Sequence, residues 1–165
     1  ILAEAGVELI APARETWAAD LPALPPKLWT LIQDETLAGV MDIGGDKGAV
    51  VLAAFSQALI KAGPAVWYVL NQARQTAQSP QAAAGQLRET EARAKLPVTG
   101  LVNNTHLMAD TDAGLVRSGA RYAREVASLT GLPVICHSVQ QSIAGGLSFP
   151  EPVLPLELTM KRPWE

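Results

Sequence analysis

The residues Leu37-Ala38-Gly39-Val40-Met41-Asp42-Ile43-Gly44-Gly45-Asp46-Lys47-Gly48 decide how the rest of this chain is interpreted. Their apolar run predicts a buried strand over 37–43 that ends on a carboxylate and turns into a long apolar helix. Parallel α/β proteins bind ligands beyond the carboxyl ends of their strands, so Asp42, Gly44 and Gly45 are the first candidate site residues. A tight turn with Asp46 as a helix cap is the purely structural alternative.

The rest of the chain alternates strands and helices at about 30 residues per unit, which is typical of right-handed crossovers. The strands are expected at 7–11, 37–43, 65–70, 98–102, 133–136 and 156–160, and the helices at 27–33, 46–62, 80–95, 113–130 and 141–144. This order predicts an α/β fold with a mostly parallel, doubly wound sheet and flanking helices. We expect one domain over residues 1–148 and a proline-rich C-terminal tail over 149–165.

Polar residues follow several of the predicted strands. Asn71 comes after the strand at 65–70, and the pairs Asn103-Asn104 and His137-Ser138 come after the next two. The carboxyl ends of parallel strands share one edge of a sheet, so these residues are expected to line a common crest. A shared function for them is a hypothesis, because every strand has to end on something polar.

Composition narrows the class of protein. The 165 residues are 48% hydrophobic and 18% charged with a net charge of -3, which favours a globular domain and argues against a nucleic-acid-binding surface. The lone cysteine, Cys136, excludes an intrachain disulfide and a cysteine-based zinc site, and it favours a reducing, cytoplasmic location. The apolar run 48–70 is interrupted by polar residues, glycine and proline, which favours a helix followed by a strand over a membrane span.

Other chemistries have weaker support. His106 and His137 could bind a metal together with Asp110 or Asp112, although two histidines on separate loops are more simply loop residues. Cys136 and His137 are neighbours on a strand and therefore face opposite sides, so Cys136 is expected to be a small core residue. Several arginines, Arg124 among them, are candidate phosphate or partner contacts, with a plain surface position as the simpler assumption.

Three segments together resemble a known family: residues 40–46, the strand ending in Val69-Leu70-Asn71, and the run 99–104. They are similar to the later half of MinD/ParA/CobQ-type P-loop ATPases. The resemblance implies that Asp42 is the Walker B carboxylate, acting on Mg²⁺ through water, and that Gly44-Gly45 senses the terminal phosphate of ATP. It also implies that Asn103 or Asn104 contacts the adenine base.

One departure from that family is large. No Gly-x-x-x-x-Gly-Lys-Ser/Thr motif occurs in the sequence, and this is the loop that holds the phosphates. The run 44–48 does not replace it, because Lys47 is followed by glycine and Asp46 would repel phosphate. Residues 1–6 look like the end of a helix, so we expect a P-loop domain without its first βα unit. Such a chain should not hydrolyse ATP and should bind nucleotide poorly.

The first hypothesis is therefore an ATP-binding domain whose nucleotide state controls a protein partner or a homodimer. The alternative is a non-catalytic α/β binding or protein-interaction module that uses the same crest. A flavodoxin-like enzyme acting on a small molecule is a third option, and the sequence offers no recognisable catalytic set for it, such as a Gly-x-Ser-x-Gly elbow.

Overall fold

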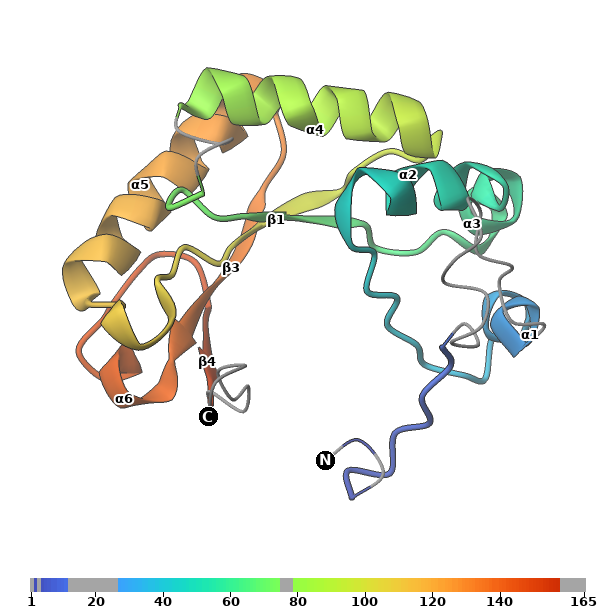
Figure 1. Ribbon diagram of the computed structural model, residues 1–165, viewed down its shortest axis with the longest axis horizontal. Helices are drawn as coiled ribbons and strands as arrows, with labels where there is room; N and C mark the ends of the chain where they lie inside the picture. The colour runs from blue at the N-terminus through green and yellow to red at the C-terminus, as the bar shows by residue number, and fades with distance from the viewer. Residues whose placement is uncertain (1, 3, 12–26, 75–78, 158–165) are drawn as a thin grey trace. The chain divides into compact units, whose positions relative to one another are not determined.

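Figure 1 shows the computed structural model, which describes residues 2, 4–11, 27–74 and 79–157. The chain divides into two compact units, and each is described by itself. Unit 1 contains residues 1–64 and 92–96, and unit 2 contains residues 65–91 and 97–165. In the ranges that the structure describes, no helix is both long enough and apolar enough to cross a membrane.

Unit 1 contains three short helices: α1 (Lys27–Gln33), α2 (Gly45–Ala53) and α3 (Ser56–Ala62). The single helix predicted over 46–62 is thus divided in two. The Ser56 hydroxyl donates a 3.0 Å hydrogen bond to the carbonyl of Ala53, and such side-chain bonds compete with the helical pattern. Helix α1 has the predicted bounds. The ring centroids of Trp29 and Phe55 lie 4.8 Å apart.

The strand predicted over 37–43 is not formed. These residues have irregular backbone, and Val40 is 95% exposed although it is apolar. A strand exists through hydrogen bonds to a neighbouring strand, and no described residue provides that pairing for this segment. The segment instead passes close to α1, because a Cβ added at Gly39 would lie 2.4 Å from a Leu31 methyl. The strand predicted over 7–11 is also irregular in structure.

Unit 2 is built on a parallel sheet. Among the described residues it has four strands in the order β1-β2-β3-β4, which are Trp67–Leu70, Gly100–Asn103, Val134–Gln140 and Val153–Leu156. Between them run α4 (Pro80–Ala94), α5 (Ala113–Thr130) and α6 (Gln141–Ala144), together with the short 3-10 helix η3 (Met108–Asp110). The α/β fold with a parallel sheet and flanking helices is therefore confirmed.

An apolar cluster forms the core of the described part of unit 2. It joins α4 and α5 to the sheet, and its buried members are Leu70, Ala83, Leu87, Val98, Leu101, Tyr122, Ala123 and Val126. Because both helices meet Leu70 and Leu101 in this cluster, they pack against the same face of the sheet. Burying a leucine side chain of this kind stabilises the fold by about 1.5–3 kcal/mol.

Strand β3 is longer than predicted, and this matters for the crest. It runs through His137 and Ser138 to Gln140, and His137 lies directly opposite Asn103 of β2. The sequence suggested that these polar residues end the strand, whereas the structure places them inside it. The last strand also starts earlier than expected, at Val153, and part of the predicted segment 156–160 lies outside the described residues.

Helix α5 has the predicted bounds because both of its ends are specified locally. The Asp112 side chain accepts a 2.7 Å hydrogen bond from the Leu115 amide, and Gly131 closes the helix with a left-handed φ of 74°. In its middle, α5 approaches the end of β2 closely. A Cβ at Gly119 would lie 2.4 Å from the Thr105 side chain and 2.8 Å from Asn103 Oδ1.

We expect Gly119→Ala to destabilise the protein by about 1–3 kcal/mol, because its methyl group would push α5 away from Thr105. The matched control is Gly85→Ala in α4, where a new Cβ meets nothing within 4 Å. That variant should be more stable by about 0.5–1 kcal/mol, since alanine favours a helix. Urea unfolding of both variants checks the pair, and stabilisation by Gly119→Ala would contradict the close packing.

Candidate functional site

Polar residues of β2 and β3 meet at the crest of unit 2, next to the end of β1. Leu70, Asn103 and His137 are in register across β1, β2 and β3. The loops that follow β1 and β2 are joined, because the Gln72 amide donates to Thr105 Oγ1 at 3.1 Å and the Asn104 amide to the Leu70 carbonyl at 2.8 Å. Asn103 and His137 are thus adjacent as predicted, although His137 lies inside β3 and not at its end.

Asn71 belongs to the same crest. Its Oδ1 accepts a 3.0 Å hydrogen bond from the Ala73 amide, and its Nδ2 lies 3.5 Å from the carbonyl oxygen of His106. The first contact shapes the turn after β1, and the second is at the outer limit of a hydrogen bond. Asn71 therefore holds its own loop and faces the loop that follows β2.

Asn103 is fully buried and uses both ends of its amide. Its Oδ1 accepts from the Thr105 backbone amide at 3.2 Å, and its Nδ2 lies 3.2 Å from Nδ1 of His137. A backbone N–H can only donate, so the contact with Thr105 fixes which end of the amide is the oxygen. Asn103 must then donate to His137, and Nδ1 of that ring is assigned as an acceptor.

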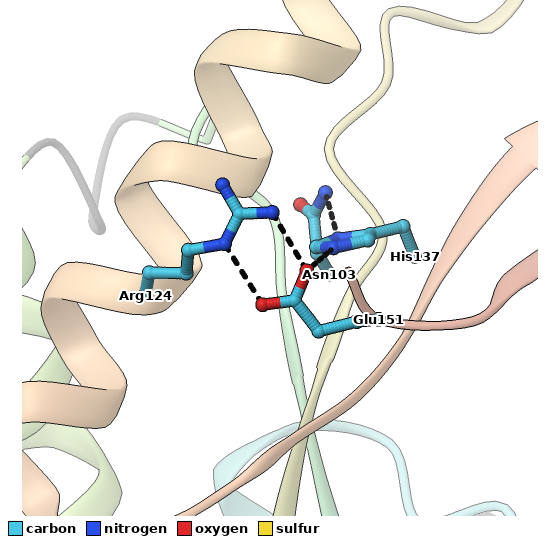
Figure 2. Close-up of polar contacts among 4 residues, drawn as sticks. All are labelled: Asn103, Arg124, His137 and Glu151. Carbon is cyan, nitrogen blue, oxygen red and sulfur yellow. Dashed lines mark hydrogen bonds and ion pairs between the residues drawn. The ribbon is translucent and has the colours of Figure 1, made fainter. Parts of the chain in front are cut away.

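The hydrogen-bond chain continues through His137 to a carboxylate (Figure 2). With Nδ1 accepting, the ring proton is assigned to Nε2, which lies 3.1 Å from Glu151 Oε2. Arg124 of α5 donates two hydrogen bonds to the same carboxylate, one of 2.8 Å from Nε and one of 2.6 Å from Nη2. The Phe149 ring packs 4.5 Å from the imidazole and covers it.

The charges in this network stabilise each other. The pKa of the Glu151 carboxyl falls from 4.5 to about 2, mainly because Arg124 donates hydrogen bonds to its charged form. Partial burial opposes this change, and the hydrogen bond from His137 adds to it. The same pairing raises the pKa of Arg124. Glu151 is therefore a carboxylate throughout the neutral range.

Ser138, the residue after His137 in β3, contacts both asparagines at the end of β2 and just beyond it. Its hydroxyl lies 2.8 Å from Asn104 Oδ1 and 3.2 Å from the Asn103 carbonyl, and it can donate to either. Asn104 is half-buried, unlike Asn103. In the part of the chain that the structure describes, no contact is recorded for Asn104 Nδ2, which leaves this amide nitrogen free to donate to a ligand.

The other predicted site residues belong to unit 1. Asp42 is exposed on the irregular segment, and Gly44 is the N-cap of α2 with ordinary angles of φ −91° and ψ 129°. Gly45 is the first residue of α2, so Asp46 lies inside the helix and is not its cap. These residues are near neighbours in the sequence, and their roles at phosphate and Mg²⁺ stay a prediction.

The histidines offer little to a metal ion. Both nitrogens of His137 contact protein groups, and His106 Nδ1 lies 3.2 Å from the Met108 amide. Across the ranges that the structure covers, no three His, Cys, Asp or Glu side chains cluster closely enough to hold a metal. Cys136 is buried, as predicted for a core residue, and burial raises the pKa of its thiol.

Sequence reasoning did not find Glu151 or Phe149, and it treated Arg124 only as a candidate phosphate or partner contact or a plain surface residue. Glu151 is 14 residues beyond His137 and lies outside the domain predicted to end at 148. Its partner Arg124 is 27 residues away on another element. No local pattern links these positions, so only the fold could bring them together.

Comparisons of the chain with models of protein families, with curated proteins and with solved structures give no match. The family resemblance therefore rests on the motifs of this chain. The structure supports its coarser part, a four-stranded parallel sheet with helices packed against it.

We expect Glu151→Gln to lower the free energy of unfolding by about 1–3 kcal/mol at neutral pH. The variant removes the negative charge to which Arg124 and His137 donate hydrogen bonds. The folded-state pKa lies below 4.5, so the carboxylate contributes fully above that pH and its contribution is lost as the pH falls towards about 2. The gap between wild type and variant should accordingly shrink on acidification.

Urea unfolding at neutral pH and at about pH 3 measures that gap. Glu125→Gln, at an exposed position on α5, is the matched control and should cost little at either pH. A gap between wild type and Glu151→Gln that stayed constant over this range would show that the carboxylate gains nothing from its partners.

Proposed function

We propose that this chain is part of an ATP-binding domain of the MinD/ParA/CobQ kind and that it provides the contact to the adenine base. Its nucleotide state would control a protein partner or a homodimer. The proposal is supported by the parallel sheet, because such folds bind ligands beyond the carboxyl ends of their strands. It is also supported by Asn103, which ends β2 at this crest, and by Asn104, which follows it.

Of the two asparagines, Asn104 is the better base contact. Asn103 is fully buried, and both ends of its amide are taken by Thr105 and His137. Asn104 is half-buried, and its side chain is held at one end only, by Ser138. Asn103 then has a structural role: it holds in place the loop that carries Asn104.

The observation that carries the proposal is the state of the Asn104 amide. The Ser138 hydroxyl holds Oδ1 at 2.8 Å and leaves Nδ2 available. Asparagine pairs with adenine through two adjacent hydrogen bonds, donating to a ring nitrogen and accepting from the exocyclic amine. Oδ1 has a second lone pair for that amine, so the bond to Ser138 is compatible with base binding.

The resemblance separately assigns the phosphate and Mg²⁺ contacts to Asp42, Gly44 and Gly45 of unit 1. An exposed carboxylate such as Asp42 suits a Mg²⁺ ion that keeps most of its water. The sequence of this chain contains no Walker A loop, so these 165 residues lack the usual phosphate cradle. We therefore propose that this chain contributes base recognition and has little affinity for the phosphates.

A second candidate, a non-catalytic interaction module, is favoured by a separate observation. Among the described strands, β1 is at one end of the sheet order, and its side chains Trp67 and Val69 are 54% and 57% exposed. Apolar groups on a terminal strand suit contact with another polypeptide. This interpretation predicts no preference for a nucleobase at the crest.

Adenosine binding to the ¹⁵N-labelled chain, followed by NMR, tests the proposal. We expect dissociation constants in the range of about 1 mM, with shifts centred on the side-chain amide of Asn104. Asn104→Ala should weaken binding at least about fivefold, because about 1 kcal/mol of hydrogen bonding is lost. Gln141→Ala, at an exposed position at the start of α6, is the control and should bind as wild type does.

Mg-ATP provides the second arm of this experiment. Its affinity should lie within a few-fold of that of adenosine, because the chain has no Walker A loop to hold the phosphates. Absence of any adenosine-dependent shift at the crest would reject the nucleotide proposal and favour the interaction module.

A further inference from the structure

The hydrogen bonds around His137 have only one consistent set of directions. The Thr105 backbone N–H donates to Asn103 Oδ1, so Asn103 Nδ2 must donate to Nδ1 of His137. The remaining ring proton on Nε2 then donates to the Glu151 carboxylate, which also accepts from Arg124. Each step follows from the one before it, because a backbone amide cannot reverse its role.

We propose that His137 is a positioning residue for Asn104 that works as a one-proton switch. In its neutral form the ring holds Asn103 in the orientation that binds Thr105. The loop that starts with Asn104 is anchored at Thr105, which in turn accepts from the Gln72 amide. This inference deepens the proposed function, and its effect on adenosine binding rests on that function.

A second proton on His137 reverses the direction of one contact. Protonated Nδ1 becomes a donor and faces the donor Nδ2 of Asn103 across 3.2 Å. The Asn103 amide relieves this conflict by turning over, which brings its NH₂ group against the Thr105 N–H. A buried donor left without an acceptor costs about 1–3 kcal/mol, so the Thr105 anchor is released.

The surroundings of the ring make the switch specific to this residue. His137 is completely buried, and Phe149 packs 4.5 Å from it. Among the described residues, the charged groups that face it are Glu151, ahead of β4, and Arg124 of α5, which is paired with that carboxylate. Glu151 remains charged when the imidazole takes up its proton, so the contact at Nε2 survives and only the Asn103 side changes.

The first test needs no nucleotide. The ¹⁵N shifts of the His137 ring at neutral pH should report a neutral imidazole with its proton on Nε2, and an Nδ1–H form would overturn the proposal. As the pH is lowered, the NMR signal of the Thr105 amide should shift with the same midpoint as the signals of the His137 ring. The amide proton of Thr105 should also exchange faster with water. A ring that titrates without any change at Thr105 would also overturn it, as would a ring that stays neutral until the protein unfolds.

The second test measures adenosine affinity between about pH 8 and pH 5. Protonation of His137 should weaken binding at least about fivefold, with the midpoint of the ring titration. His137→Gln is the informative variant, because a glutamine can accept from Asn103 and donate to Glu151 at every pH. It should bind adenosine with no pH dependence in this range, provided that its amide spectrum remains that of the folded protein.

His106→Gln is the matched control, since His106 is the other histidine of the sequence and lies on the loop after β2. The pH dependence should persist in that variant, and its loss there would contradict the assignment to His137. If adenosine fails to bind at any pH, the proposed function is rejected. The ring and Thr105 measurements then decide the switch independently.

Discussion

The hydrogen bond between Asn103 and His137 is the contact on which the crest of unit 2 depends. It joins β2 to β3 at a position where both side chains are completely buried. Through Thr105 it reaches the loop after β1, and through Glu151 it reaches α5 and the chain ahead of β4. A buried amide and imidazole are costly in an apolar core unless their polar atoms are hydrogen-bonded, and here each nitrogen and oxygen of the two side chains has at least one partner.

Close packing and polar bonding support each other in this arrangement. Gly119 lets α5 approach the Thr105 side chain, and that approach brings the same helix near enough for Arg124 to grip Glu151. The low pKa of Glu151 is a consequence, because the carboxylate is held by two residues on different elements, Arg124 of α5 and His137 of β3. A shift of α5 would therefore weaken the buried network as well as the apolar core.

An element of this structure was predictable from the sequence where residues close by in the chain specify it. The bounds of α5 were predictable because Asp112 and Gly131 specify its ends within the chain itself. The length of β3 was not, because His137 looks like a loop residue until its distant partners are known. The segment 37–43 shows the opposite failure, since an apolar pattern cannot form a strand without a neighbour to pair with.

The sequence alone could not tell Asn103 from Asn104, because their difference also depends on distant partners. Consecutive residues at the end of a strand point in different directions, so one of them turns into the core and its neighbour towards the crest. Asn103 is satisfied by the protein alone, and its burial makes any ligand contact expensive. Asn104 keeps an amide nitrogen without a recorded partner among the residues described. The structural asparagine is thus what holds the loop of the other in place, because its bond to the Thr105 amide fixes the residue that follows Asn104.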